Sequence, residues 1–82
     1  MQENFKEKMK GVQRIVNYYD PDGVIALGAP EDEYDKYSFK ILSLHKSKNL
    51  TKLQLQKVFS NTLNYSEIDW NEMLDGLQKL LD

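Results

Sequence analysis

Carboxylate side chains concentrate in one short stretch of this 82-residue chain. Six of its thirteen acidic residues lie between positions 20 and 35, namely Asp20, Asp22, Glu31, Asp32, Glu33 and Asp35. Carboxylates are the side chains that coordinate hard cations and that act as general acids and bases. The stretch therefore raises the hypothesis of a metal-dependent or acid–base enzyme that uses residues 20–35.

The spacing of these carboxylates does not match a calcium-binding loop. Asp20, Asp22 and Glu31 would occupy the first, third and twelfth positions of an EF-hand. The fifth position would then be Val24, and Ile25 would replace the glycine required at the sixth. A looser site would need several oxygens to converge, whereas neighbouring carboxylates in a loop normally point into water. We predict no bound metal and no cofactor.

The other reactive residue types form no catalytic constellation. His45 is the only histidine and cysteine is absent, so neither a thiolate–metal site nor a cysteine nucleophile is available. No serine lies in the Gly-x-Ser-x-Gly context of a nucleophile elbow. We interpret His45 as a surface or half-buried structural residue and predict that the chain is not an enzyme.

Helix capping explains part of the acidic cluster. Asp20 followed by Pro21 is typical of an N-cap residue and the first residue of a helix. Gly28 can adopt the left-handed backbone conformation that ends a helix. Together these residues predict a short helix over residues 21–27. Asp35 is predicted as the N-cap of the helix that follows.

Capping leaves the middle of the cluster unexplained. One cap already serves the next helix start, so Glu31, Asp32 and Glu33 are surplus to that role. With Tyr34 they are the predicted binding residues of an acidic loop, residues 31–35, that meets a basic protein. The leading hypothesis is therefore a non-catalytic protein–protein interaction or regulatory module. An immunity-like partner that neutralises a basic protein is one version of it.

Apolar periodicity predicts helices in the rest of the chain. Apolar residues recur every three or four positions from residue 3 to 19, which is one face of an α-helix. Residues 36–46 are predicted as a second helix, because an isolated alternating segment would have no strand to pair with. Thr51 opens the next helix, with Gln54 completing a capping box. Ser66 opens the last helix, which runs to the C-terminus.

Chain length and these helices predict one all-α domain. Residues 1–82 are expected to form a small, partly open bundle of four helices plus one short helix after the first. Because cysteine is absent, apolar packing rather than disulfides has to hold the fold together. The predicted core comprises Phe5, Met9, Val12, Val16, Ile25, Leu27, Ile41, Leu44, Leu55, Val58, Phe59, Trp70, Met73, Leu74 and Leu77.

Charge is distributed in blocks, although the net charge is only −2. Residues 36–57 carry six lysines and no carboxylate. We predict no nucleic-acid partner, because Arg14 is the only arginine and no aromatic platform accompanies the lysines. No apolar run approaches the ~20 residues that span a bilayer, so we expect a cytoplasmic protein with no membrane partner. The sequence leaves open whether the protein is a monomer or a homodimer.

The acidic stretch also resembles the signature of a known family. Asp20-Pro21, followed by apolar residues and then by the run Gly-Ala-Pro-Glu-Asp-Glu-Tyr-Asp that ends at Asp35, resembles the YugE-like family. These are small uncharacterised bacterial proteins known mainly from bacilli and their relatives. The resemblance implies an all-helical, partly open bundle, a bacterial cytoplasmic setting and no assigned biochemical activity. The family often continues with proline where this chain has Lys36, but proline is only favoured at a helix start, not required.

Overall fold

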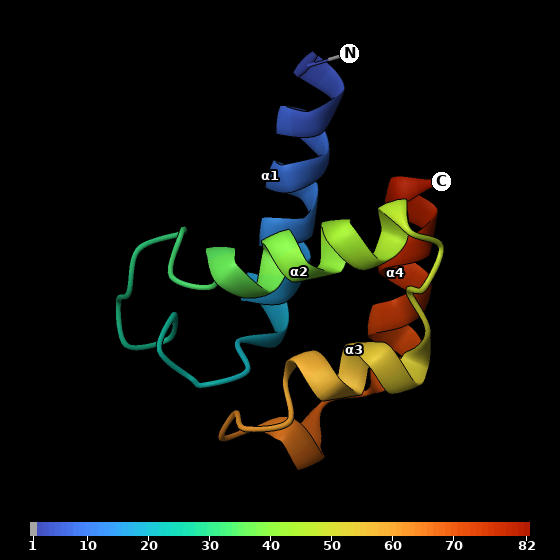
Figure 1. Ribbon diagram of the computed structural model, residues 1–82. Coiled ribbons are helices and arrows are strands. Elements are labelled where there is room, and N and C mark those ends of the chain that lie inside the picture. The colour runs from blue at the N-terminus through green and yellow to red at the C-terminus, as the bar shows by residue number, and fades with distance from the viewer. Residues whose placement is uncertain (1) are drawn as a thin grey trace.

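Four α-helices and one short 3-10 helix make up the chain in the computed structural model, which describes the backbone of residues 2–82 and the side chains of residues 5–82 (Figure 1). The elements in chain order are α1 (Gln2–Tyr19), α2 (Asp35–Lys46), α3 (Lys52–Val58), η1 (Tyr65–Glu67) and α4 (Trp70–Leu81). Residues 2–82 contain no strand, so the predicted all-α class is confirmed. No helix in this part of the chain is both long and apolar enough to span a bilayer.

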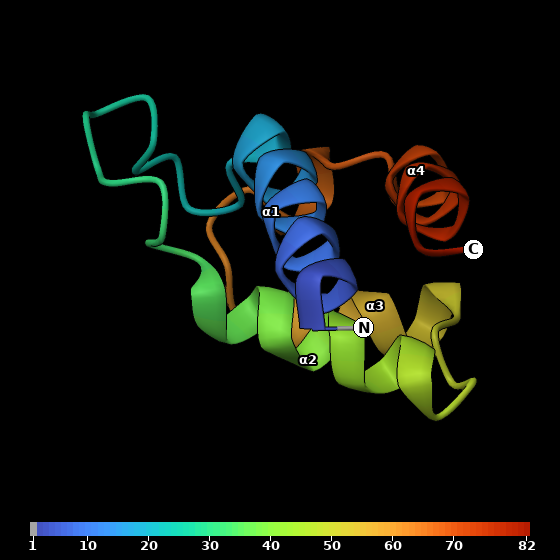
Figure 2. The same ribbon diagram turned by 90° about the horizontal axis from the view of Figure 1, so that it is seen from above.

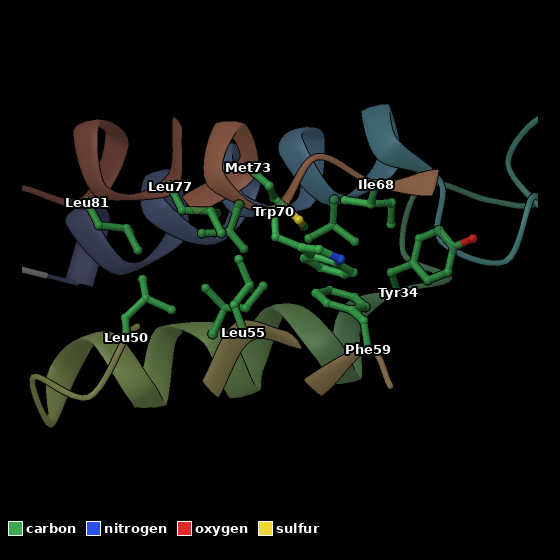
Figure 3. Packing of buried hydrophobic residues seen from close by; sticks show 12 residues of the cluster. Tyr34, Leu50, Leu55, Phe59, Ile68, Trp70, Met73, Leu77 and Leu81 are labelled. Carbon is green, nitrogen blue, oxygen red and sulfur yellow. The ribbon is translucent and has the colours of Figure 1, made fainter. Parts of the chain in front are cut away.

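The helices pack in two layers. Helix α1 contacts α2 and α4, while α3 contacts α2 and α4. Seen from above, α1 and α4 form one layer and α2 and α3 the other (Figure 2). The buried side chains fill the space between these layers (Figure 3). The N-terminal half of α1 extends beyond α2, so the bundle is open at that end (Figure 1).

The centre of the core is aromatic. Phe59, the C-cap residue that follows α3, is fully buried, and its ring centroid lies 4.8 Å from that of Tyr37 and 5.7 Å from that of Trp70. Tyr65 packs on the other side of Trp70 at 5.1 Å, and its carbonyl accepts the indole N–H. Tyr34 extends the row beyond Tyr37 at 5.9 Å. These rings tie α2, α3, η1 and α4 into one unit.

Most of the predicted core is confirmed. The buried members are Val12, Val16, Ile41, Leu55, Phe59, Trp70, Met73 and Leu77, and the partly buried ones are Met9, Ile25, Leu44, Val58 and Leu74. Two predictions were wrong, because Phe5 is 51 % exposed and Leu27 is 86 % exposed. Leu27 lies in a turn rather than on a helix face. The core also includes residues that were not predicted, namely Tyr34, Leu50, Ile68 and Leu81.

The short helix predicted over residues 21–27 does not form, and turns take its place. Asp20 has a φ of 48°, a left-handed conformation that ends α1 instead of starting a new helix. Its carboxylate accepts the N–H groups of Ile25 and Ala26, five and six residues on, whereas an N-cap accepts from the second or third helical residue. Gly28 has the predicted positive φ, 98°, but it closes a turn and not a helix.

The other predicted helix starts have different outcomes. Thr51 caps α3 as predicted, because its hydroxyl accepts the N–H of Gln54 at 3.2 Å. The prediction for Ser66 was wrong, since this residue lies within η1. Asp69 caps α4 instead and accepts the N–H of Glu72 at 3.1 Å. The chain therefore makes one extra turn before the last helix begins.

Replacing Gly76 with alanine should stabilise the fold. Gly76 is in the middle of α4, and a Cβ there would meet Ile15 Cδ1 at 3.9 Å, an ordinary van der Waals distance. Because alanine is favoured over glycine inside helices, Gly76→Ala should raise the free energy of unfolding by about 0.5–1 kcal/mol in urea titrations. Gly11→Ala is the matched control, since its Cβ would lie 2.5 Å from Leu80 Cδ2 and that side chain must move. A Gly76→Ala chain that is less stable than the Gly11→Ala chain would contradict this packing of α1 on α4.

Candidate functional site

The α1–α2 loop, residues 20–34, projects from the bundle and carries three adjacent carboxylates (Figure 1). We call Glu31, Asp32 and Glu33 the acidic triplet. All three side chains are exposed. Their placement depends on how the two ends of the loop are fixed to the bundle.

A buried tyrosine joins the two ends of the loop. The hydroxyl of Tyr34 donates to Asp20 Oδ1 at 2.7 Å and accepts the N–H of Asp22 at 2.8 Å. The same carboxylate accepts the N–H groups of Ile25 and Ala26, each at 3.0 Å. Tyr34 is only 1 % exposed, and it lies at the edge of the core in Figure 3. One phenol ring therefore belongs to the core while its hydroxyl closes the loop.

The pKa values of Tyr34 and Asp20 are shifted in the directions that the hydrogen bond between them requires. Burial, and next the hydrogen bond to the Asp20 carboxylate, raises the pKa of Tyr34 from 10.0 to about 12. For Asp20, burial alone would raise the pKa. The hydrogen bonds from Tyr34 and from the backbone N–H groups of the loop outweigh it and lower the pKa below 3.8. The contact therefore holds a neutral phenol against an ionised carboxylate.

The end of the loop next to the acidic triplet is attached to α1. Asn17 Nδ2 donates to the carbonyl of Glu31 at 2.9 Å. Gln13 Nε2 donates to Asp35 Oδ1 at 2.9 Å. The prediction that Asp35 caps α2 was therefore wrong: it is the first residue of α2, Tyr34 precedes it, and no side chain caps this helix. Its carboxylate holds α2 against α1 instead.

The beginning of the loop is attached to the turn between α3 and η1. Asp22 Oδ1 accepts the N–H of Leu63 at 3.0 Å. The carbonyl of Pro21 accepts the N–H of Asn64 at 2.7 Å, and Pro21 itself is fully buried. Pro21 thus anchors the loop in the core and does not start a helix.

These contacts separate the predicted binding residues into two groups. Tyr34 was predicted to bind a partner, but it is buried and its hydroxyl already has two partners, so it acts inside the molecule. The side chains of Glu31, Asp32 and Glu33 form no ion pair with any of residues 5–82. Of the four predicted binding residues, the three of the acidic triplet are therefore the ones available to another molecule.

The geometry does not support a metal site in this loop. Within residues 5–82, no group of three or more His, Asp or Glu side chains lies close enough together to hold a metal ion. The carboxylates of Asp20, Asp22 and Asp35 each accept hydrogen bonds from other parts of the chain. The acidic side chains therefore diverge and do not converge on one point.

A second surface lies at the opposite end of α2 and was not predicted. A groove of about 1000 Å³ runs between the N-terminal half of α1, α2 and the end of α4. His45 lies beside it, half-buried as predicted, with Nε2 2.9 Å from Asp82 Oδ1. The block of lysines was a signal for this surface, but only the packing of three helices brings the lining residues together. No family model, no curated protein and no solved structure matches the chain, so function has to be inferred from these two surfaces.

Proposed function

We propose that this protein is a non-catalytic protein–protein interaction module that docks on a basic surface through the acidic triplet. The observation that carries the proposal is the exposure of three successive carboxylates without an ion-pair partner among residues 5–82, on a loop fixed at both ends. Three adjacent negative charges repel one another, and a complementary positive surface removes that cost. Such a patch also steers a basic partner during encounter.

The rigid attachment of the loop supports binding. A flexible loop loses conformational entropy when a partner orders it, and this loss reduces affinity. In this protein the contact between Tyr34 and Asp20, together with the bond from Asn17 to Glu31, orders the loop beforehand. The backbone that carries the acidic triplet is therefore held at both ends of the loop before any partner arrives.

We also propose membership of the YugE-like family and a regulatory role in the bacterial cytoplasm. In support, the signature residues Asp20, Pro21, Gly28 and Tyr34 are those that shape the loop. A signature that specifies the loop is what we expect if the loop is the working part of the protein. An immunity-like role, in which the acidic triplet covers the basic surface of another protein, is the concrete form of this proposal.

Charge reversal of the acidic triplet should abolish capture of a partner without unfolding the protein. Glu31→Lys combined with Asp32→Lys should reduce the amount of basic protein captured from a native bacterial extract by at least about tenfold, the factor that a loss of 1.4 kcal/mol produces. Because both side chains are exposed, the free energy of unfolding should change by less than about 0.5 kcal/mol. Capture is read by quantitative mass spectrometry and stability by urea titration.

The control variant makes the same change in net charge at two positions outside the loop. Glu7→Lys combined with Glu67→Lys alters two exposed carboxylates outside the loop and gives the same net charge. This control chain should capture the partner as the natural chain does. Equal loss in both double variants would show that net charge, and not the acidic triplet, governs capture.

A further inference from the structure

The groove beside α2 combines exposed apolar side chains with an apolar floor. Phe5 on α1 and Phe39 on α2 are each 51 % exposed and face the same groove. Leu42 and Leu50 also line it. Contiguous apolar surface of this kind, bordered by polar groups, is typical of a protein interaction site.

The border of the groove is positively charged. Lys8, Lys46 and Lys48 line it, and none of the three forms an ion pair with residues 5–82. Among residues 5–82, the one side-chain carboxylate in the lining belongs to Asp82, and its Oδ1 lies 2.9 Å from His45 Nε2. An occupant that suits the groove therefore has negative charge next to an apolar side chain.

Lys48 occupies a position where glycine would be more stable. After the last turn of α2 its N–H donates to the carbonyl of His45 at 3.0 Å, and the next N–H, of Asn49, donates to Leu44 at 2.8 Å. These two hydrogen bonds form a Schellman motif. Lys48 occupies its C′ position, which is usually glycine. Lys48 has a φ of 63° and bears the resulting backbone strain. A residue that breaks a local rule at the edge of a groove is typical of a functional position.

We infer that the groove of one copy binds the α1–α2 loop of a second copy of this chain. The inference rests on the proposed function, because it identifies the basic surface that the acidic triplet meets. The loop has the chemistry that the groove requires. The triplet supplies three carboxylates, and Leu27, in the same loop, is an apolar side chain that is 86 % exposed. Three lysines and two phenylalanine rings of the groove face those groups.

The loop cannot fill the groove of its own chain. The loop joins the first residue of α2, whereas Lys46 and Lys48 lie at the other end of that helix (Figure 1). Twelve helical residues separate the two by roughly 18 Å. The bonds of Tyr34 and Asn17 hold the loop in place. If two copies of the chain pack side by side in opposite orientations, each loop reaches the groove of the other copy. The result is a closed dimer with two identical loop–groove contacts.

The test is a complementary charge swap, with mass measured by light scattering over a concentration series at about 0.01 M salt, where charges act over roughly 30 Å. The natural chain should associate in a concentration-dependent way and dissociate at about 1 M salt. Loop reversal (Glu31→Lys with Asp32→Lys) and groove reversal (Lys46→Glu with Lys48→Glu) should each weaken association by at least about tenfold. An equal mixture of the two reversed chains should associate again, because each loop then meets a groove of opposite charge. One of the two contacts has the natural charges, and the other has both signs reversed.

Two further variants test whether weaker association could result from loss of folding. Lys48→Gly removes one positive charge while relieving the backbone strain, so it should weaken association in a chain at least as stable as the natural one. Lys10→Glu with Lys52→Glu reverses two exposed lysines outside the groove and should associate normally.

The outcomes separate this inference from the proposed function. A natural chain that stays monomeric at every concentration overturns the inference, while loss of partner capture on loop reversal would still support the proposed function. Association that is unaffected by groove reversal also overturns the inference. If loop reversal changes neither association nor capture, both proposals fall.

Discussion

Phe59→Ala should lower the free energy of unfolding by about 3–5 kcal/mol, the usual cost of removing a buried aromatic ring. Phe59 is fully buried and packs against Tyr37 on α2 and Trp70 on α4. The substitution therefore leaves a cavity where three helices meet. Small domains have only about 5–15 kcal/mol of stability in total, so this change alone should bring the chain close to unfolding. Urea titration followed by circular dichroism measures the loss.

An exposed phenylalanine provides the control for this prediction. Phe39→Ala makes the same chemical change at a ring that is half exposed, so the expected loss is much smaller than that of Phe59→Ala. If Phe59→Ala leaves too little folded protein to titrate, Phe59→Leu keeps a large apolar side chain and should lose less stability than Phe59→Ala, because it leaves a smaller cavity. Similar losses for Phe39→Ala and Phe59→Ala would contradict the position of the core.

Tyr34→Phe should lower the free energy of unfolding by roughly 1–3 kcal/mol while preserving the core. The ring stays, but the hydroxyl that donates to Asp20 and accepts the N–H of Asp22 is lost. A buried N–H without a partner carries the desolvation cost that sets this magnitude. Hydrogen exchange should accelerate at the amides of Ile25 and Ala26, which also bond to Asp20, and change little in α4.

The stability contributed by Tyr34 should depend on pH in a defined direction. Its folded-state pKa is raised from 10.0 to about 12, so its contribution is complete below pH 10 and disappears as the pH rises toward 12. The folded-state pKa of Asp20 is lowered from 3.8, so its contribution is present above pH 3.8 and disappears at lower pH. The difference in stability between the natural chain and Tyr34→Phe should therefore shrink at both extremes.

A second tyrosine serves as the control for that titration. Tyr18 is 79 % exposed, and its hydroxyl makes no hydrogen bond with the described side chains or backbone. Tyr18→Phe should change the free energy of unfolding at neutral pH by less than about 0.5 kcal/mol. The difference in the free energy of unfolding between the natural chain and Tyr34→Phe should not stay constant up to pH 12. A constant difference would show that the Tyr34 hydroxyl is not hydrogen-bonded in the folded state.

The helices could be predicted from the sequence because their signals are local. Spacings of three and four residues define the buried faces of α1 and α4, and the Thr51 cap lies three residues from its donor. The start of α4 was misplaced because two cap residues compete there. Ser66 precedes an apolar segment, but Asp69 followed three residues later by Glu72 has the same capping-box form, and it is the one that operates.

The acidic loop and the groove could not be predicted, because non-local contacts shape both. Asp20 has the form of an N-cap in the sequence, but its carboxylate bonds to Tyr34, fourteen residues away. Tyr34 follows three acidic residues and was for that reason assigned to the surface, although its ring packs beside Tyr37 in the core. The groove requires the packing of α1, α2 and α4 before its lysines and phenylalanines share one surface.

One titration tests most directly whether the acidic triplet is the docking element on a loop ordered by Tyr34. The measured quantity is the dissociation constant of the purified captured partner with three chains, namely the natural chain, Glu31→Lys with Asp32→Lys, and Tyr34→Phe. We expect the natural chain to bind tightest and the charge-reversed chain to bind at least about tenfold more weakly. Tyr34→Phe should fall between them, because it keeps the charges but loses the ordering of the loop. A charge-reversed chain that binds as tightly as the natural one would contradict the account.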